Sequence, residues 1–203
     1  MFVKICGITN GEEARAVARL NPDALGFVFW PRSRRFVEPE EVGSWDLPGD
    51  ICKVGVFVDL PPADVAHTVE QAGLDVIQLH GNERVSEYVD LLADIQLERW
   101  KSVHLEPGRS VNPVAVDAFL VDSRTEEMPG GTGRVCNWAD AAAFAANCGR
   151  RVVLAGGLTV DNVAEAIGCV SPWGVDVSSG VEDSTGKKSL SLVEEFILQC
   201  RRR

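Results

Sequence analysis

The chain has 203 residues, of which 45% are hydrophobic, and its formal net charge at pH 7 is −10. This length and apolar content suit one domain over residues 1–203 with a large core. The negative charge argues against nucleic acid or an anionic membrane surface as a partner, because both attract basic surfaces.

Short β-rich runs alternate with amphipathic helical patterns along the whole chain, which is typical of a parallel α/β fold. The expected strands are 2–6, 24–29, 52–58, 76–79, 97–103, 118–121, 151–155 and 174–177. Several of them, including 26–29 and 152–155, are apolar throughout, as strands covered on both faces are. Eight strands in strict alternation favour a single (β/α)₈ TIM barrel with short loops over an open doubly wound sheet, which has about six strands.

Helix starts can be read between these strands from capping residues and from apolar residues at helical spacing. Helices are expected after Asn10, Pro61, Asn82, Asn137, Thr159 and Ser189, with a short helix over 39–45. The weakest unit is 106–114, which has two prolines and little periodicity.

The cysteines and the N-terminal segment bear on compartment and cofactors. The six cysteines form no C-x-x-C pair and show no disulfide-framework spacing, so reduced thiols are expected. No metal-ligand cluster accompanies the candidate site residues, and we expect neither metal nor cofactor. No apolar run reaches the ~18 residues of a membrane span and no leader is visible after Met1, so we expect a cytoplasmic protein.

In such a barrel, reactive groups come from the carboxyl ends of the strands and the loops that follow. Gly156-Gly157 leads into the helix expected after Thr159, and Ser178-Ser179-Gly180 follows the eighth strand. Both loops offer backbone N–H groups at the place where these barrels commonly hold phosphate. The glycines alone would only indicate tight turns, but the pair of loops predicts a phosphate site.

Cys6 and Asp122 are the acid–base candidates, because each stands at the exit of an expected strand. A lone buried cysteine is usually an inert small hydrophobe, so the spacing leaves the role of Cys6 open. Asp122 follows an apolar run, where a carboxylate needs a partner or a function. Arg35 is a candidate for a second anionic group, opposite the phosphate.

Two further polar residues have two interpretations each. His80, near the rim, is either a hydrogen-bonding structural residue or a catalyst, and the former interpretation is the commoner. Asp176 interrupts an apolar strand, and its spacing suits either a contact to a substrate hydroxyl or a structural hydrogen bond.

Read together, these segments resemble the phosphoribosylanthranilate isomerase family of tryptophan biosynthesis. The matching stretches are 4–10 (Lys-Ile-Cys-Gly-Ile-Thr-Asn), 26–29, 33–35, 54–58, 78–81, 120–123, 130–133, 154–158, 175–182 and 186–187. They follow one another in order over nearly the whole chain. The local departure is 135–138, where Val-Cys-Asn-Trp stands in place of the family's Phe-Asp-Trp-like segment.

The resemblance implies an Amadori rearrangement of N-(5-phosphoribosyl)anthranilate without a cofactor. It implies that Cys6 is the general base and Asp122 the general acid, and that Arg35 holds the anthranilate carboxylate. The Gly156-Gly157 and Ser178-Ser179-Gly180 loops match the family's phosphate site. The expected partner is therefore a small phosphorylated substrate, and the oligomeric state is left open between monomer and homodimer.

Two rival interpretations follow from the same features. One is a related isomerase of the histidine pathway, or a dual-substrate isomerase, but those enzymes resemble two-aspartate sites and here Cys6 stands in place of one aspartate. The other is a non-catalytic barrel that binds a phosphometabolite as a regulator. The presence of Cys6, Asp122 and Arg35 together argues against a purely binding role.

Overall fold

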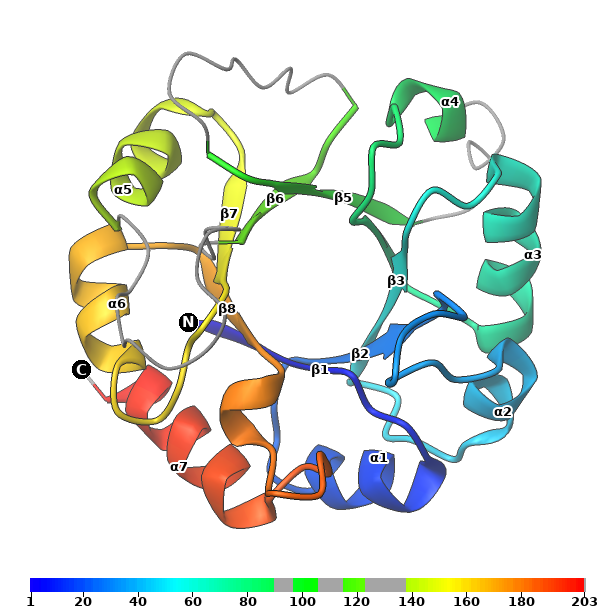
Figure 1. Ribbon diagram of the computed structural model, residues 1–203, viewed down its shortest axis with the longest axis horizontal. Helices are drawn as coiled ribbons and strands as arrows, with labels where there is room; N and C mark the ends of the chain where they lie inside the picture. Colours follow the sequence, from blue (N-terminus) through cyan, green and yellow to red (C-terminus); the bar gives the residue numbers. More distant parts are fainter. Residues whose placement is uncertain (90–96, 106–114, 123–137, 203) are drawn as a thin grey trace.

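The computed structural model describes residues 1–89, 97–105, 115–122 and 138–202. Eight parallel strands form a closed barrel in which each strand pairs with its neighbours in chain order and the eighth pairs with the first. Figure 1 shows this ring of strands with the helices outside it. The strands are β1 (Phe2–Cys6), β2 (Ala24–Val28), β3 (Cys52–Phe57), β4 (Val76–Leu79), β5 (Glu98–Val103), β6 (Ala118–Asp122), β7 (Arg151–Ala155) and β8 (Gly174–Val177).

The eight expected strands and the barrel are thus confirmed, with strand ends that differ from the expected ones by at most one residue. Seven α-helices lie within the described residues, and a 3₁₀ turn, η1 (Ser179–Val181), follows β8. The helices are α1 (Gly11–Ala18), α2 (Pro39–Ser44), α3 (Pro62–Ala72), α4 (Ser86–Val89), α5 (Trp138–Asn147), α6 (Val163–Val170) and α7 (Leu190–Arg201). The expected start after Asn137 and the weak unit over 106–114 lie outside the described residues.

Local sequence explains most helix starts. The Asn10 side chain accepts a hydrogen bond from the Glu13 N–H at 2.9 Å, which caps α1 as expected. Pro62 stands in the first turn of α3, where the missing proline N–H costs no hydrogen bond. Two expected starts were too early: α4 begins at Ser86 and not directly after Asn82, and α6 begins at Val163 and not directly after Thr159.

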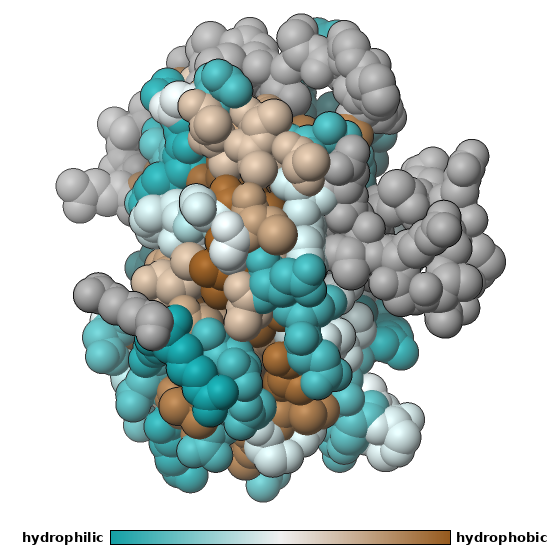
Figure 2. Space-filling view, turned by 90° about the vertical axis from the view of Figure 1, so that its left-hand side faces the viewer, coloured by the Kyte–Doolittle hydropathy of each residue, from teal (hydrophilic) through white to brown (hydrophobic). Residues whose placement is uncertain are grey.

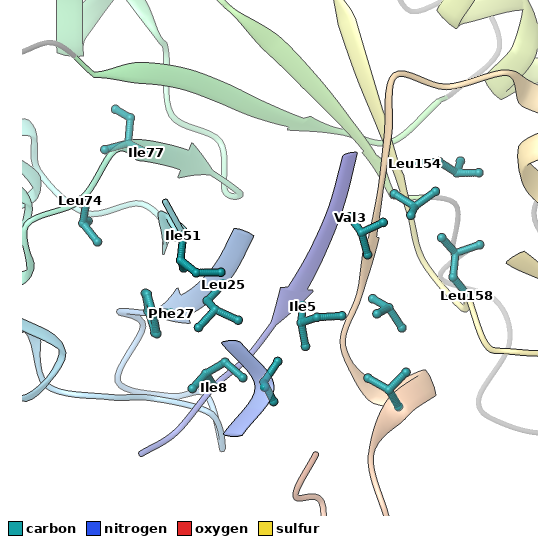
Figure 3. Close-up of a cluster of buried hydrophobic side chains, with 14 of the residues drawn as sticks. Val3, Ile5, Ile8, Leu25, Phe27, Ile51, Leu74, Ile77, Leu154 and Leu158 are labelled. Carbon is teal, nitrogen blue, oxygen red and sulfur yellow. The ribbon is translucent and has the colours of Figure 1, made fainter. Parts of the chain in front are cut away.

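The core has two layers because successive strand residues point to opposite faces of the sheet. Val3 and Ile5 of β1 belong with Leu25 and Phe27 of β2 to the larger cluster, which fills the space between the barrel and the helices. Figure 3 shows these four side chains in that cluster. The helices are therefore held to the barrel by the outward-facing half of each strand.

The inward-facing half fills the barrel itself with a smaller apolar cluster. Its fully buried members are Ala24, Val54, Val76, Trp100, Ala118, Leu120, Val153 and Ala155. Phe2 and Trp173 pack against it near the amino ends of the strands. Toward the carboxyl ends of the strands the inward-facing residues are polar, and these residues form the candidate site.

The outer surface of the α5 and α6 side is mixed in character. Figure 2 shows tan and brown residues in a broken band between hydrophilic ones on this side. Within the described part of the chain, every helix is too short or too polar to span a lipid bilayer.

Candidate active site

Strand alternation gathers polar side chains inside the carboxyl end of the barrel. Because Val3 and Ile5 face the helices, Lys4 and Cys6 of β1 face inward. The same reasoning turns Asp122 inward beside Leu120, and Asp176 inward between Val175 and Val177. All four polar residues are buried. The carboxyl ends of strands that are far apart in sequence therefore contribute to one polar layer.

Cys6 is the last residue of β1, and only 8% of it is exposed. It lies opposite Gly26 in the β1–β2 register, and a Cβ at Gly26 would stand 2.7 Å from the Cys6 sulfur. Only glycine at position 26 leaves room for the sulfur. Burial raises the pKa of the Cys6 thiol, although the neighbouring Lys4 acts to lower it. The thiol is therefore protonated in the free protein at neutral pH.

Lys4 is completely buried, and its ammonium donates a hydrogen bond to Asp176 Oδ1 at 2.9 Å. The two residues are partners in the β1–β8 register. Burial is the largest effect and opposes the charge on Lys4, but Asp176 and Cys6 together outweigh it and the pKa of Lys4 is raised, so the lysine stays protonated. The structure thus gives Asp176 a hydrogen-bonded ion pair within the barrel wall.

Asp122 ends β6 and is 8% exposed, with Ala155 of β7 as its register partner. Its charge reaches His80, where it acts to raise the histidine pKa against the larger, lowering effect of burial. Asp122 and His80 therefore face the same interior. The charges of Lys4 and Asp176 also change the pKa of His80, which follows β4: Lys4 acts to lower it and Asp176 to raise it.

His80 makes two hydrogen bonds through one ring nitrogen. The Gln78 amide nitrogen lies 3.3 Å from His80 Nδ1, and the Ser102 hydroxyl lies 2.7 Å from the same atom. Burial lowers the pKa of His80, which favours the neutral ring. His80 is thus held as a neutral, hydrogen-bonded side chain in this interior.

The two expected phosphate loops lie against each other. Gly156 and Gly157 both have positive φ, 87° and 66°, which only glycine adopts without strain. A Cβ at Gly180 would collide with the carbonyl oxygen of Leu158, so glycine there lets the loop after β8 touch the loop after β7. Ser179 and Gly180 begin η1, and the first N–H groups of such a turn have no partner within it.

The late start of α6 changes how this loop is built. The Asn162 side chain accepts a hydrogen bond from the Thr159 N–H at 2.8 Å and donates one to the Gly157 carbonyl at 3.0 Å. Local bonds of this kind compete with helix formation, which explains why residues 159–162 form a turn. The helix N-terminus expected directly after Thr159 is therefore absent, and the backbone of this loop lies next to η1 instead.

Arg35 lies beside the exit of β8, and its contact with a second anionic group stays a prediction. Its Nε and Nη2 donate to the two carboxylate oxygens of Glu182 at 2.7 and 2.9 Å. Its Cδ lies over Gly7, where a Cβ would collide with it. The reason for this placement is the buried carboxylate of Glu182, which follows η1 and anchors the guanidinium.

Glu182 joins several segments around the mouth. Besides Arg35, it accepts hydrogen bonds from Lys188 at 2.9 Å and from Arg34 at 2.9 Å. Burial opposes its ionisation, but the hydrogen bonds from Arg35 and Lys188 outweigh burial and lower the pKa of Glu182 to about 2. Lys188 also donates to the carbonyl oxygen of Ser178 at 3.0 Å and so supports the β8 exit loop.

Sequence reasoning missed Lys4, Gln78, Ser102, Glu182 and Lys188 as parts of the site. The available signal was a polar residue at an inward position, two residues before an expected site residue, as in Lys4 before Cys6 and Gln78 before His80. Ser123 and Gly130-Gly131-Thr132-Gly133, which also resemble the family, lie outside the described residues. No group of three or more His, Cys, Asp or Glu side chains within the described ranges is arranged to hold a metal ion.

Comparisons with known proteins match this architecture over almost its full length. The model of the N-(5'-phosphoribosyl)anthranilate (PRA) isomerase family matches residues 3–199. An N-(5'-phosphoribosyl)anthranilate isomerase of Pelobacter propionicus is 45% identical over 200 residues, which cover 96% of this chain and 93% of that protein. The crystal structure of the phosphoribosyl anthranilate isomerase of Thermotoga maritima is 35% identical, covers 98% of both chains and superposes with a TM-score of 0.87.

A further solved structure shows a phosphoribosyl anthranilate isomerase in complex with reduced 1-(o-carboxyphenylamino)-1-deoxyribulose 5-phosphate. It is 32% identical to this chain, covers 98% of it and 97% of its own length, and has a TM-score of 0.80. The sequence matches and the shared barrel agree. The chain belongs to the N-(5'-phosphoribosyl)anthranilate isomerase family.

Proposed function

We propose that this chain catalyses the Amadori rearrangement of N-(5-phospho-β-D-ribosyl)anthranilate to 1-(2-carboxyphenylamino)-1-deoxy-D-ribulose 5-phosphate, with Cys6 as general base and Asp122 as general acid. The observation that carries the assignment of the two groups is their common environment. Both end strands of one closed barrel, both are buried and both face its interior at the carboxyl end. An acid and a base on different walls of one mouth can act on a substrate between them.

Substrate binding is assigned to the two loops and to Arg35. The phosphate would lie against the N–H groups of Gly156, Gly157, Ser179 and Gly180, where backbone donors and glycine conformations favour a bound anion. Ser178 supplies a hydroxyl at the same loop. The Arg35 guanidinium, held by Glu182, is the cation assigned to the anthranilate carboxylate.

In the first chemical step, Asp122 donates its proton to the ribose ring oxygen. The bond from C1 to this oxygen breaks, the ring opens, and the nitrogen lone pair forms a C1=N iminium. Asp122 must carry the proton at the moment of reaction, and it is a carboxylate once the ring has opened.

In the second step, the Cys6 thiolate removes the proton from C2 and becomes a thiol. The electron pair of the C–H bond forms an enolamine, which tautomerises to the C2 ketone, so the overall reaction is an isomerisation. Burial raises the pKa of Cys6 in the free protein. The thiol therefore gives up its own proton to solvent water before this step, and the cationic iminium beside the sulfur favours the thiolate that remains. A reactive thiol of this kind also fits the reducing cytoplasm, where we expect the chain to work.

The test is the loss of substrate fluorescence when the purified protein meets freshly generated phosphoribosylanthranilate. Wild type should consume the substrate rapidly, whereas Cys6→Ala should lose at least ~10²-fold in kcat. Cys200→Ala is the matched control, because Cys200 is also a buried free thiol but belongs to α7. It should retain wild-type kcat.

Each outcome has a separate meaning. Loss of substrate with wild type and with Cys6→Ala at similar rates would remove Cys6 from the mechanism and keep the activity. No loss with any of the three proteins would overturn the substrate assignment, and the histidine-pathway aminoaldose would be tested next.

A further inference from the structure

Lys4 is a charged side chain in a place where packing alone does not require one. It is 0% exposed and lies inside the barrel, above a layer of apolar residues. Moving an ion pair into a protein interior costs so much that apolar residues of similar volume often stabilise a fold as well or better. The Lys4–Asp176 pair is therefore poorly explained by stability.

The position of Lys4 relates it directly to Cys6. The two residues are two apart on β1 and point to the same side. A Cβ at Gly26 would lie 2.9 Å from Lys4 Cε and 2.7 Å from the Cys6 sulfur, so both side chains cover the same glycine. The positive charge of the Lys4 ammonium acts to lower the pKa of the Cys6 thiol.

Other charged groups also face Cys6. The charge of Asp176 on β8 acts to raise the pKa of the thiol. Lys188, from the segment after η1, acts to lower it, as Lys4 does. Asp122 of β6 and His80 after β4 share the interior with Lys4 and Asp176. Lys188 donates its hydrogen bonds to Glu182 and to the Ser178 carbonyl. Lys4 and Asp176 are thus the charged pair of the barrel wall that sets the environment of the sulfur.

We propose that Lys4 is a positioning residue that stabilises the Cys6 thiolate through its fixed ammonium, and that Asp176 moderates this effect. The inference rests on the proposed function, in which Cys6 is the base. Lys4 keeps its own proton throughout, because Asp176 holds it as an ammonium. The C2 proton of the substrate goes to the sulfur alone, and Lys4 lowers the cost of the anionic sulfur before that transfer.

This arrangement predicts different effects for neutral and for charged replacements of Lys4. Lys4→Met removes the positive charge while keeping a long, unbranched side chain, so the thiolate should become rarer. Lys4→Arg keeps the positive charge, because a guanidinium does not lose its proton in a protein, so the thiolate should stay about as abundant as in wild type. If Lys4 were purely structural, both replacements would change the reactivity of Cys6, because either one would loosen the same contact.

The experiment is alkylation of Cys6 by iodoacetamide across pH 6 to 9, followed on the Cys6 peptide by mass spectrometry. Alkylation follows the thiolate fraction, and one nearby charge changes a thiol pKa by ~1 unit or more. At pH 8 we therefore expect Lys4→Met to slow the reaction about tenfold and Lys4→Arg to react at close to the wild-type rate, with the pH profile of Lys4→Met moved to higher pH. Cys200 in the same digests reports any general opening of the fold.

The proposal is overturned if Lys4→Met alkylates within twofold of wild type, or if Lys4→Arg is as slow as Lys4→Met with an unchanged Cys200 signal. If Lys4→Met does not fold, Lys4→Gln, which is neutral but can still donate a hydrogen bond to Asp176, takes its place. These readings need no turnover. If Cys6→Ala proves active, the base assignment fails while the effect of Lys4 on the thiol is still measured, so the two failures can be told apart.

Discussion

The two ends of the barrel interior have opposite chemistry. At the amino end, Phe2 stacks on Trp173 with ring centroids 4.4 Å apart, and Trp100 meets both rings edge-on at 5.8 and 6.2 Å. At the carboxyl end, the inward positions hold the Lys4–Asp176 ion pair together with Cys6 and Asp122. One closed sheet thus carries an aromatic plug at one end and a layer of buried ionisable groups at the other.

The difference shows where stability and chemistry are located. Aromatic burial is favourable, and the polar edges of the plug are satisfied, since Trp100 Nε1 donates to Glu98 at 2.9 Å and Arg151 pairs with Glu98 at 2.8 Å. Buried ionisable groups are unfavourable unless they are paired, and they raise or lower each other's pKa values. We expect substitutions at the amino end to change stability, and substitutions at the carboxyl end to change turnover.

The largest effect is expected for Asp122→Asn, which keeps the shape of the side chain but removes the acid. Turnover should fall at least ~10²-fold, while the free energy of unfolding should change little. Steady-state kinetics and urea unfolding of the same samples test both statements. Asp161→Asn, an exposed aspartate in the turn before α6, is the control and should keep wild-type kcat. A near-normal rate for Asp122→Asn would exclude Asp122 as the acid.

The mirror experiment at the amino end is Trp173→Ala. It removes a half-buried ring that stacks on Phe2 and lies under the Arg151 guanidinium, 4.6 Å from the ring centroid. We expect a loss of about 2 kcal/mol in unfolding free energy, less than for a fully buried tryptophan, with kcat within about twofold of wild type. Trp30→Ala, which removes a more exposed ring, should cost clearly less stability. A large fall in kcat without a loss of stability would contradict the expectation that substitutions at the amino end change stability and not turnover.

The barrel could be predicted from the sequence because its information is local. Most strands are short apolar runs that end at polar or glycine residues, so the strands could be placed to within one residue. Cys6, Asp122 and the two glycine loops could be found because they stand at strand exits. The resemblance to a family then added the roles of individual residues.

The charged network could not be predicted, because it depends on contacts across the closed barrel. Lys4 and Asp176 are 172 residues apart and meet only through the β1–β8 register. Arg35 meets Glu182 across a similar separation, and this contact decides which side of the mouth the guanidinium occupies. The predicted start of α6 was wrong for a different reason, since the Asn162 side chain competes with the helix for local hydrogen bonds.

The smallest effect is a change in the unfolding free energy at low pH. We expect this pH dependence at the carboxyl end of the barrel but not at the amino end. The folded-state pKa of Glu182 is about 2, below its ordinary value of 4.5. Its ionisation therefore stabilises the fold fully at pH values above the ordinary pKa, and this contribution disappears as the pH falls from 4.5 toward 2.

Glu182→Gln removes this contribution and leaves Arg35 and Lys188 without their carboxylate. The unfolding free energy of this variant should be lower than that of wild type at pH 6, and the gap should narrow at pH 4 and again at pH 3. For Trp173→Ala the gap should stay constant over the same range, because no ionisation is removed. A constant gap for Glu182→Gln would mean that the carboxylate contributes packing and not charge to the carboxyl end.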